Sequence, residues 1–291
     1  MFSGSIPALV TPFAAGRVDE EAFRVFVEWQ ISEGSSGLVP CGTTGEVATL
    51  THEEQHRLFE LAVDQAKGRV PVIAGCGSNN TATAIDHMKV AADLGADAAL
   101  IVLPYYNKPS QAGLLAHFEA LAAASPLPMI VYNVPGRTVA DISVATLAEV
   151  AKLPSVVGIK DATGNLGRVT AQRLACGPDF CQLSGNDETA LAFNAMGGVG
   201  CISVSANVAP KLCAEFQLAT REGRWADALA LQDKHYPLHD AMFADASPGP
   251  AKYALSRVRP GFPTDLRLPL TEPSAEAKRA VDAALEHAGL A

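Results

Sequence analysis

The sequence predicts an α/β fold: a closed (β/α)8 barrel of the TIM type with a C-terminal helical appendage. Eight short apolar runs alternate with longer amphipathic runs, and 291 residues with 48% hydrophobic content suffice for such a barrel, which typically uses about 250 residues. Strands separated by helices pair in parallel through right-handed crossovers, and eight such units close a barrel. A doubly wound open sheet is the alternative, but no G-x-G-x-x-G motif follows the first run.

The eight apolar runs are the expected barrel strands. They cover residues 4–13, 37–42, 71–77, 98–104, 128–134, 156–162, 181–186 and 198–204. Glycine, proline or polar residues bound these runs, a pattern typical of buried strands that end in turns. We therefore expect a parallel sheet whose turns carry the polar residues.

Amphipathic patterns between the runs predict helices, for example over residues 19–34 and 51–68. The second of these opens with Thr51 followed three residues later by Glu54, which is the spacing of a capping box. Gly68 marks its end. These signals set the boundaries of a helix that directly follows one of the polar turns.

The regular alternation stops at about residue 224, where helical patterns follow one another. These cover 224–235, 250–258 and 273–288. We expect a catalytic barrel over residues 1–223 and a helical region over residues 224–291 that is not an independent domain.

Charge and hydropathy exclude several classes of partner. The net charge of −9 gives no electrostatic footprint for nucleic acid or an anionic membrane surface, so a small-molecule partner is expected. No apolar run approaches the ~20 residues of a membrane helix. The N-terminus lacks a cationic segment before its apolar stretch, so no secretory signal is expected and the protein is predicted to be cytoplasmic.

The sequence predicts no metal centre. Its six cysteines show no C-x-x-C pair and no ligand spacing with histidine, so we expect reduced thiols in or near the core. His235 and His239 could place two ligands on one helix face, but Pro237 lies between them and no third ligand is near. A surface helix is the expected structure there.

Lys160 ends the apolar run that starts at Val156, where an unpaired ammonium is costly to bury. Burial disfavours the charged form of an amine, which makes a lysine nucleophilic. Alternatively, Lys160 extends out of the strand end or pairs with Asp161. Lys160 is the exception among the lysines, because the others lie in polar loops or helical patterns: Lys67, Lys89, Lys108, Lys152, Lys211, Lys234, Lys252 and Lys278.

Polar residues follow several other predicted strands. Catalytic groups in a barrel come from the carboxyl ends of the strands and the loops after them. Taken singly, each polar residue at these strand ends is explained as a turn residue, a packing residue or a surface charge. Taken together, they occur at the same end of successive strands, which favours a shared site. They are Thr43 and Thr44 in "CGTTGE", Tyr105 and Tyr106 in "PYYNKPS", and Tyr132 and Arg137 in "VYNVPGRT".

Three of these motifs, "GTTGE", "YNVPGRT" and "GIKDATGN", resemble the dihydrodipicolinate synthase branch of the N-acetylneuraminate lyase superfamily of Schiff-base aldolases. The resemblance covers the whole chain. It implies a (β/α)8 barrel in which a lysine, here Lys160, condenses with the keto group of pyruvate. The iminium that forms is the electron sink, so no metal or organic cofactor is required.

The resemblance also implies roles for the other strand-end residues. Tyr132 would relay protons, and Thr43 would link it to Tyr106, which in the family reaches in from a neighbouring subunit. Thr44 would hold the pyruvate carboxylate. Arg137 would bind the carboxylate of the second substrate, L-aspartate 4-semialdehyde.

Gly185 and Ile202 resemble residues that shape the pocket near the lysine. The family also implies a homotetramer built as a dimer of dimers. The same barrel serves pyruvate lyases that act on sialic acid or 2-keto-3-deoxy sugar acids, but Arg137 favours an aldehyde that carries a carboxylate. A non-catalytic binding barrel would lack Lys160 or Tyr132, and both are present.

One departure from the family concerns regulation by the end product. Lysine-regulated members bind L-lysine at the subunit interface with residues that match His52, Asn79 and Tyr105, together with a glutamate and a histidine. This chain has Thr83 and Gln55 at those last two positions. We expect L-lysine to inhibit weakly or not at all, because threonine cannot pair with an amino group. The alternative is that Asp86, one turn further along the predicted helix, supplies the charge.

Overall fold

Seven parallel strands form one curled sheet in the computed structural model, which describes residues 2–125 and 127–291. The strand order is β1-β9-β8-β7-β6-β5-β4. The strands are β1 (Gly4–Pro7), β4 (Ile73–Gly75), β5 (Ala98–Val102), β6 (Met129–Asn133), β7 (Val156–Asp161), β8 (Cys181–Ser184) and β9 (Gly200–Ser203). Each is shorter than its predicted run, because one or both ends of every run lie outside the hydrogen-bonded ladder.

The second predicted strand closes the ring through isolated bridges. On one side the Val39 N–H donates to Pro7 O at 3.0 Å and the Leu9 N–H donates to Val39 O at 2.9 Å. On the other side the Ile73 N–H donates to Leu38 O at 2.8 Å. The segment therefore takes the eighth place between β1 and β4, and the predicted (β/α)8 barrel is confirmed.

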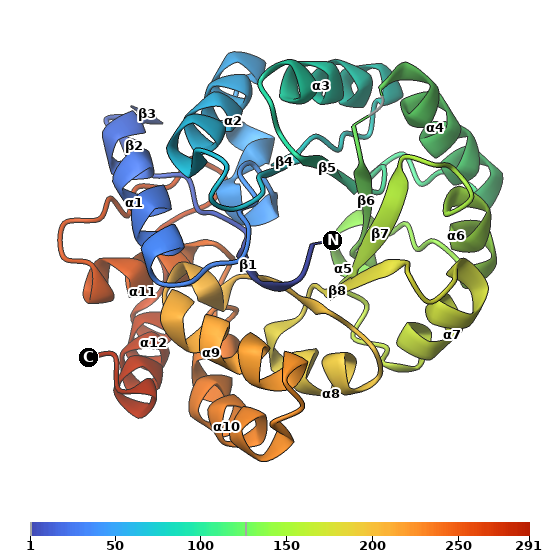
Figure 1. Ribbon diagram of the computed structural model, residues 1–291. Coiled ribbons are helices and arrows are strands. Elements are labelled where there is room, and N and C mark those ends of the chain that lie inside the picture. The colour runs from blue at the N-terminus through green and yellow to red at the C-terminus, as the bar shows by residue number, and fades with distance from the viewer. Residues whose placement is uncertain (1, 126) are drawn as a thin grey trace.

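Helices surround the barrel, as Figure 1 shows from one end. They are α1 (Glu20–Ser32), α2 (His52–Ala66), α3 (Thr81–Asp93), α4 (Gln111–Ala124), α6 (Val144–Val150), α7 (Gly167–Cys176), α8 (Ala190–Ala195) and α9 (Pro210–Arg221). The predicted capping box at the start of α2 is confirmed, because Thr51 and Glu54 exchange side-chain to backbone hydrogen bonds at 3.2 and 3.0 Å. The helices cover the outer faces of the strands and bury their apolar side chains.

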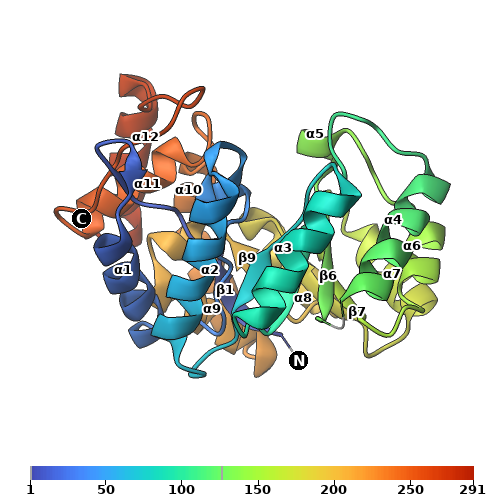
Figure 2. The same ribbon diagram turned by 90° about the horizontal axis from the view of Figure 1, so that it is seen from above.

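Short elements lie in the loops. The helix α5 (Pro135–Thr138) follows β6 and lies at the end of the molecule opposite the N-terminus (Figure 2). Four 3-10 turns follow other strands: η1 (Thr43–Gly45), η2 (Val47–Thr49), η3 (Asp187–Thr189) and η4 (Ser205–Asn207). A hairpin of β2 (Phe13–Ala14) and β3 (Arg17–Val18) was not predicted from the sequence. These loop elements mark the mouth of the barrel.

The C-terminal region consists of α10 (Trp225–Ala241), α11 (Gly249–Val258) and α12 (Ala275–Ala288). The helix α10 was predicted to end at residue 235, but it continues through Pro237. A proline inside a helix leaves the carbonyl four residues earlier without its donor. That carbonyl, of Asp233, lies 3.3 Å from Nε2 of His287 in α12, which compensates for the lost bond. The division of the chain at residue 223 stays a prediction.

The expected surface position of His235 and His239 is wrong. Both are buried, with 1% and 4% of their surface exposed, because α10 packs this face against α9 and η3. Nδ1 of His239 lies 2.8 Å from Oγ of Ser205, and burial lowers the pKa of His235 to about 4. Within residues 2–125 and 127–291, no three histidine, cysteine or acidic side chains are grouped to hold a metal ion.

The six cysteines are free thiols, as predicted. Five are buried and Cys176 is half-buried. Burial raises the pKa of each, to about 11 for Cys181, which leaves them protonated and unreactive near neutral pH. No helix in the described part of the chain is long and apolar enough to span a bilayer.

Candidate active site

Lys160 and Tyr132 form the floor of the candidate site. They are paired in register on the neighbouring strands β7 and β6, and both are buried, with 5% and 6% of their surface exposed. Nζ of Lys160 lies 4.2 Å from the centroid of the Tyr132 ring. Tyr132 belongs to the apolar cluster that fills the barrel, which also contains Ile6, Val39, Ile73, Ile130, Leu183 and Ile202. The amine therefore lies inside the barrel against an aromatic ring.

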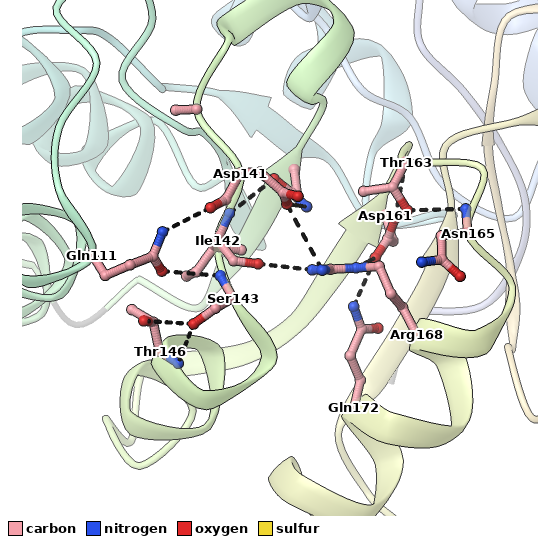
Figure 3. A network of polar contacts seen from close by, with 12 residues as sticks. Gln111, Asp141, Ile142, Ser143, Thr146, Asp161, Thr163, Asn165, Arg168 and Gln172 are labelled. Carbon is pink, nitrogen blue, oxygen red and sulfur yellow. Dashed lines mark hydrogen bonds and ion pairs between the residues drawn. The ribbon is translucent and has the colours of Figure 1, made fainter.

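The neighbouring acid, Asp161, does not pair with Lys160. Successive side chains of a strand point to opposite faces, so Asp161 faces the helical layer instead. Its carboxylate accepts hydrogen bonds from Thr163 Oγ1 at 2.6 Å, Gln172 Nε2 at 2.7 Å and Arg168 Nε at 3.0 Å (Figure 3). The pairing of Lys160 with Asp161 that the sequence left open is therefore wrong, and so is the extension of this lysine into solvent.

Arg168 extends this polar network behind the floor of the site. One of its terminal nitrogens donates to Ile142 O at 2.9 Å, and the other lies 3.8 Å from Asp141 (Figure 3). Asn133 in turn donates to Asp141 at 2.8 Å. Asn133 and Asp161 directly follow the two floor residues, so the network fixes the ends of both strands from outside the barrel. This network was not predicted from the sequence, although strand alternation indicates that both residues point outward.

Gly185 lies against Lys160. A Cβ at this position would lie 2.6 Å from Cβ of Ala162 and 3.1 Å from Cε of Lys160. A side chain here would collide with Ala162 and crowd Lys160, so the position favours glycine for a steric reason. Ile202, on β9, is fully buried in the barrel interior. Both predicted pocket-shaping residues therefore occupy the inside of the barrel.

The turn after the second strand carries Thr43 and Thr44. It forms η1, in which Thr44 is buried and Thr43 is half-buried. Thr43 and Tyr132 line the same small cavity of about 30 Å³, so the structure brings the predicted proton-relay pair together. Gly45 lies so close to Leu9 that an added Cβ would be 2.9 Å from its carbonyl oxygen. The turn is thus packed directly onto the segment that follows β1.

A larger cavity of about 400 Å³ opens above this turn. Arg137 on α5 reaches it from one side and Thr43 from another. Its other lining residues are Val47, Ala48, Leu50, His52, Gln55, Gly77, Ser78, Thr83, His87, Val102, Tyr105, Val134 and Thr138. Burial and the neighbouring His52 and His56 lower the pKa of His87 to about 4. The lining residues include a guanidinium but no carboxylate, which favours an anionic ligand.

Tyr106 does not reach the site of its own chain. It is 89% exposed, and two other apolar side chains in the loops after β5 and β6, Tyr105 and Val139, are 40% and 65% exposed. Tyr106 has a positive φ of 72°, an uncommon conformation for a tyrosine that turns the chain at this rim. We refer to these three exposed side chains, Tyr105, Tyr106 and Val139, as the rim.

Lys160 is not the only buried lysine, in contrast to the prediction. Lys252, which lies in a helical pattern, is fully buried, and its Nζ lies 2.5 Å from Oε1 of Glu46. Glu46 ends the "GTTGE" motif. This contact was not predicted, because the mixed pattern around Lys252 does not show which face of the helix is buried.

Comparison with known proteins places this architecture in one family. The model of the dihydrodipicolinate synthetase family matches residues 1–288. A 4-hydroxy-tetrahydrodipicolinate synthase from Rhizorhabdus wittichii is 67% identical over 291 residues, and one from Zymomonas mobilis is 64% identical over 290 residues; each alignment covers all of both chains.

Solved structures agree with the sequence relatives. The dihydrodipicolinate synthase of Aquifex aeolicus superimposes with a TM-score of 0.97 at 40% identity over 99% of both chains. The enzyme from Acinetobacter baumannii, described as chloride inhibited and complexed with pyruvate, gives a TM-score of 0.97 at 43% identity over 100% of both chains. With its barrel, its strand-end motifs and these relatives, the chain belongs to the dihydrodipicolinate synthetase family.

Proposed function

We propose that this chain is a 4-hydroxy-tetrahydrodipicolinate synthase, a lyase that condenses pyruvate with L-aspartate 4-semialdehyde through a Schiff base in lysine and diaminopimelate biosynthesis. The observation that carries the proposal is the buried amine of Lys160 against the Tyr132 ring, with Gly185 leaving room beside it. The synthases from Rhizorhabdus wittichii and Zymomonas mobilis support the same assignment.

The reaction starts at Nζ of Lys160. The amine attacks the keto carbon of pyruvate, a C–N bond forms, and the keto oxygen leaves as water. The iminium draws electrons from the methyl carbon, which loses a proton and becomes an enamine. Tyr132, with Thr43 beside it in the small cavity, is placed to carry protons in these steps.

The enamine carbon then attacks the aldehyde carbon of L-aspartate 4-semialdehyde, and a C–C bond forms. The amino group of this second substrate replaces Nζ of Lys160 at the former keto carbon, so cyclisation frees the lysine and releases the product. Every bond made to the enzyme is broken again, which returns Lys160 to its starting state.

Substrate recognition follows from the charges around the larger cavity. Thr44, in the buried turn, would bind the pyruvate carboxylate. Arg137 would bind the carboxylate of the aldehyde, since a guanidinium fork matches that group. A polyhydroxylated aldehyde would require hydrogen-bonding groups instead, which makes a sialic acid or sugar acid lyase the less favoured function.

The assembly completes the site in this proposal. The exposed rim of Tyr105, Tyr106 and Val139 would pack against a second copy of the chain, which would bring Tyr106 to the Thr43 of its neighbour. We infer a homotetramer, a dimer of dimers, located in the cytoplasm. A related structure is described as the first monomeric variant of a dihydrodipicolinate synthase, so the assembly must be measured for this chain.

A coupled assay of pyruvate with a panel of aldehydes tests the proposal. We expect turnover with L-aspartate 4-semialdehyde and little with N-acetylmannosamine or uncharged sugars. Lys160→Ala is the control, because it removes the nucleophile from the same barrel. Efficient cleavage of N-acetylneuraminate by the wild-type protein, without use of L-aspartate 4-semialdehyde, would assign the chain to the lyases.

A further inference from the structure

A fully buried ion pair joins the C-terminal region to the turn that carries Thr43 and Thr44. Nζ of Lys252, on α11, lies 2.5 Å from Oε1 of Glu46, and neither side chain has any exposed surface. Nζ also donates to Asp265 O at 2.6 Å and lies 4.4 Å from the centroid of the Phe13 ring. A buried charge without its partner is strongly destabilising, so each member of this pair depends on the other.

Arg267 reinforces the same connection. Its backbone N–H donates to Oε2 of Glu46 at 3.2 Å, so both carboxylate oxygens of Glu46 have a partner in the C-terminal region. Its guanidinium donates to Thr49 O at 2.9 Å and forms two bonds with Glu54, at 2.6 and 2.7 Å. The C-terminal region therefore holds residues 46–54 at three successive points.

The backbone of Glu46 explains why its side chain must be held. Glu46 directly follows η1 and has φ 56° and ψ 33°, a left-handed conformation that is costly for a residue other than glycine. Its N–H donates to Thr43 O at 3.1 Å. The orientation of Glu46 is thus coupled directly to the backbone of the turn, and the partners of its side chain maintain the strained conformation.

We propose that Lys252 is a positioning residue for the reaction: through Glu46 it holds the turn in the geometry in which Thr44 binds the pyruvate carboxylate and Thr43 meets Tyr132. This inference rests on the proposed function. Lys252 lines neither cavity of the site, and the proposed nucleophile Lys160 lies on β7 and not on the turn, so the covalent step and the positioning of the turn are separable by experiment.

The test compares Lys252→Met, Glu46→Gln and the double variant in steady-state assays with both substrates. Lys252→Met leaves the Glu46 carboxylate buried without its counter-ion, so we expect the turn to shift, the KM for pyruvate to rise and kcat/KM to fall on the order of a hundredfold. The double variant should recover part of this loss, because an amide carries no charge and still accepts the Arg267 N–H. Glu46→Gln alone, which keeps the shape of the side chain, should lower kcat/KM by roughly tenfold.

Two controls separate positioning from general stability. Leu255→Ala removes a fully buried side chain from the same helix, and it should lower the unfolding temperature without changing the KM for pyruvate. Borohydride trapping at saturating pyruvate should still modify Lys160 in every variant. If Lys252→Met and Glu46→Gln keep the wild-type KM and kcat per folded chain, the positioning role is wrong. If the wild-type protein traps no pyruvate, the proposed function itself fails.

Discussion

The floor of the candidate site and its rim are built in opposite ways. At the floor, Lys160 and Tyr132 lie on paired strands, are almost fully buried, and are backed by the Asp161 and Arg168 network on the outer face of the sheet. At the rim, the tyrosines are exposed, with Tyr106 at 89%, and they extend from a loop between β5 and α4. One chain therefore completes the floor but leaves the rim open.

This difference separates two parts of the chemistry. In the proposed function, the Schiff base with pyruvate uses groups of one chain only: the amine and the ring at the floor, with Gly185 beside the lysine, and Thr44 in the buried turn. In the proposed function, proton transfer through Tyr106 and recognition of the second substrate would involve the rim and Arg137, which is exposed on α5. We therefore expect changes at the floor to stop all turnover, and changes at the rim to affect condensation more than Schiff-base formation.

The largest effect is expected at the floor. Lys160→Ala should lower turnover by roughly 10⁴-fold or more, because the proposed function assigns the covalent intermediate to this amine alone. Initial rates in the coupled assay measure this, and the urea midpoint should show a protein that is still folded. Lys152→Ala, at an exposed lysine 69% accessible, is the matched control and should keep full activity. Retained turnover in Lys160→Ala would show that the floor is not where the chemistry occurs.

Disruption of the rim should have the next largest effect. Tyr106→Phe keeps the ring but removes the hydroxyl, so condensation should fall on the order of a hundredfold, as expected for loss of a proton-transfer group. Sedimentation velocity should show an unchanged assembly. Dilution until the assembly dissociates should cause the same loss while borohydride still traps pyruvate. A fully active monomer would leave Tyr106 as an ordinary packing residue.

Arg137 lies between the two regions and should affect one substrate only. A charged hydrogen bond is worth roughly 1.5–3 kcal/mol, so Arg137→Ala should raise the KM for L-aspartate 4-semialdehyde by about ten- to a hundredfold. The KM for pyruvate should change little. Arg137→Lys keeps the charge but loses the bidentate geometry. Its KM for L-aspartate 4-semialdehyde should therefore lie between those of the wild type and Arg137→Ala. Equal losses for both substrates would mean that Arg137 has a structural role.

The smallest effect is expected from L-lysine. Thr83 lies in the wall of the larger cavity, where no lining residue is acidic, and the exposed Asp86 is not among the lining residues. L-lysine should therefore inhibit the wild-type protein weakly or not at all, and Thr83→Glu should increase its affinity. Initial rates against L-lysine concentration at saturating pyruvate measure both. Strong inhibition of the wild type at micromolar L-lysine would contradict the interpretation of Thr83.

The local parts of the fold were predictable from the sequence. Buried parallel strands are short apolar runs, and the capping box of α2 is a four-residue signal, so both are visible along the chain. The polar strand ends, including Lys160, Tyr132 and Arg137, were found for the same reason. The strand lengths were overestimated, because a run does not show where the last hydrogen bond of the ladder lies.

The contacts that were missed join distant parts of the chain. Glu46 and Arg267 are 221 residues apart, and the helix pattern around Lys252 does not show which face is buried. His235 was misplaced for a similar reason, since Pro237 indicates an end to the helix and the compensating contact of Asp233 with His287 comes from another element. Long-range polar pairs of this kind carry no periodic signal in one sequence.

The most direct test of the account is borohydride trapping of the wild-type protein with pyruvate, followed by intact-mass spectrometry and peptide mapping. Lys160 and Lys252 are both buried, but only Lys252 has a carboxylate partner, at 2.5 Å. We predict a reduced pyruvate adduct on the peptide that contains Lys160 and none on the peptide that contains Lys252. An adduct on any other lysine, or no adduct at saturating pyruvate, would contradict the assignment of Lys160 as the nucleophile.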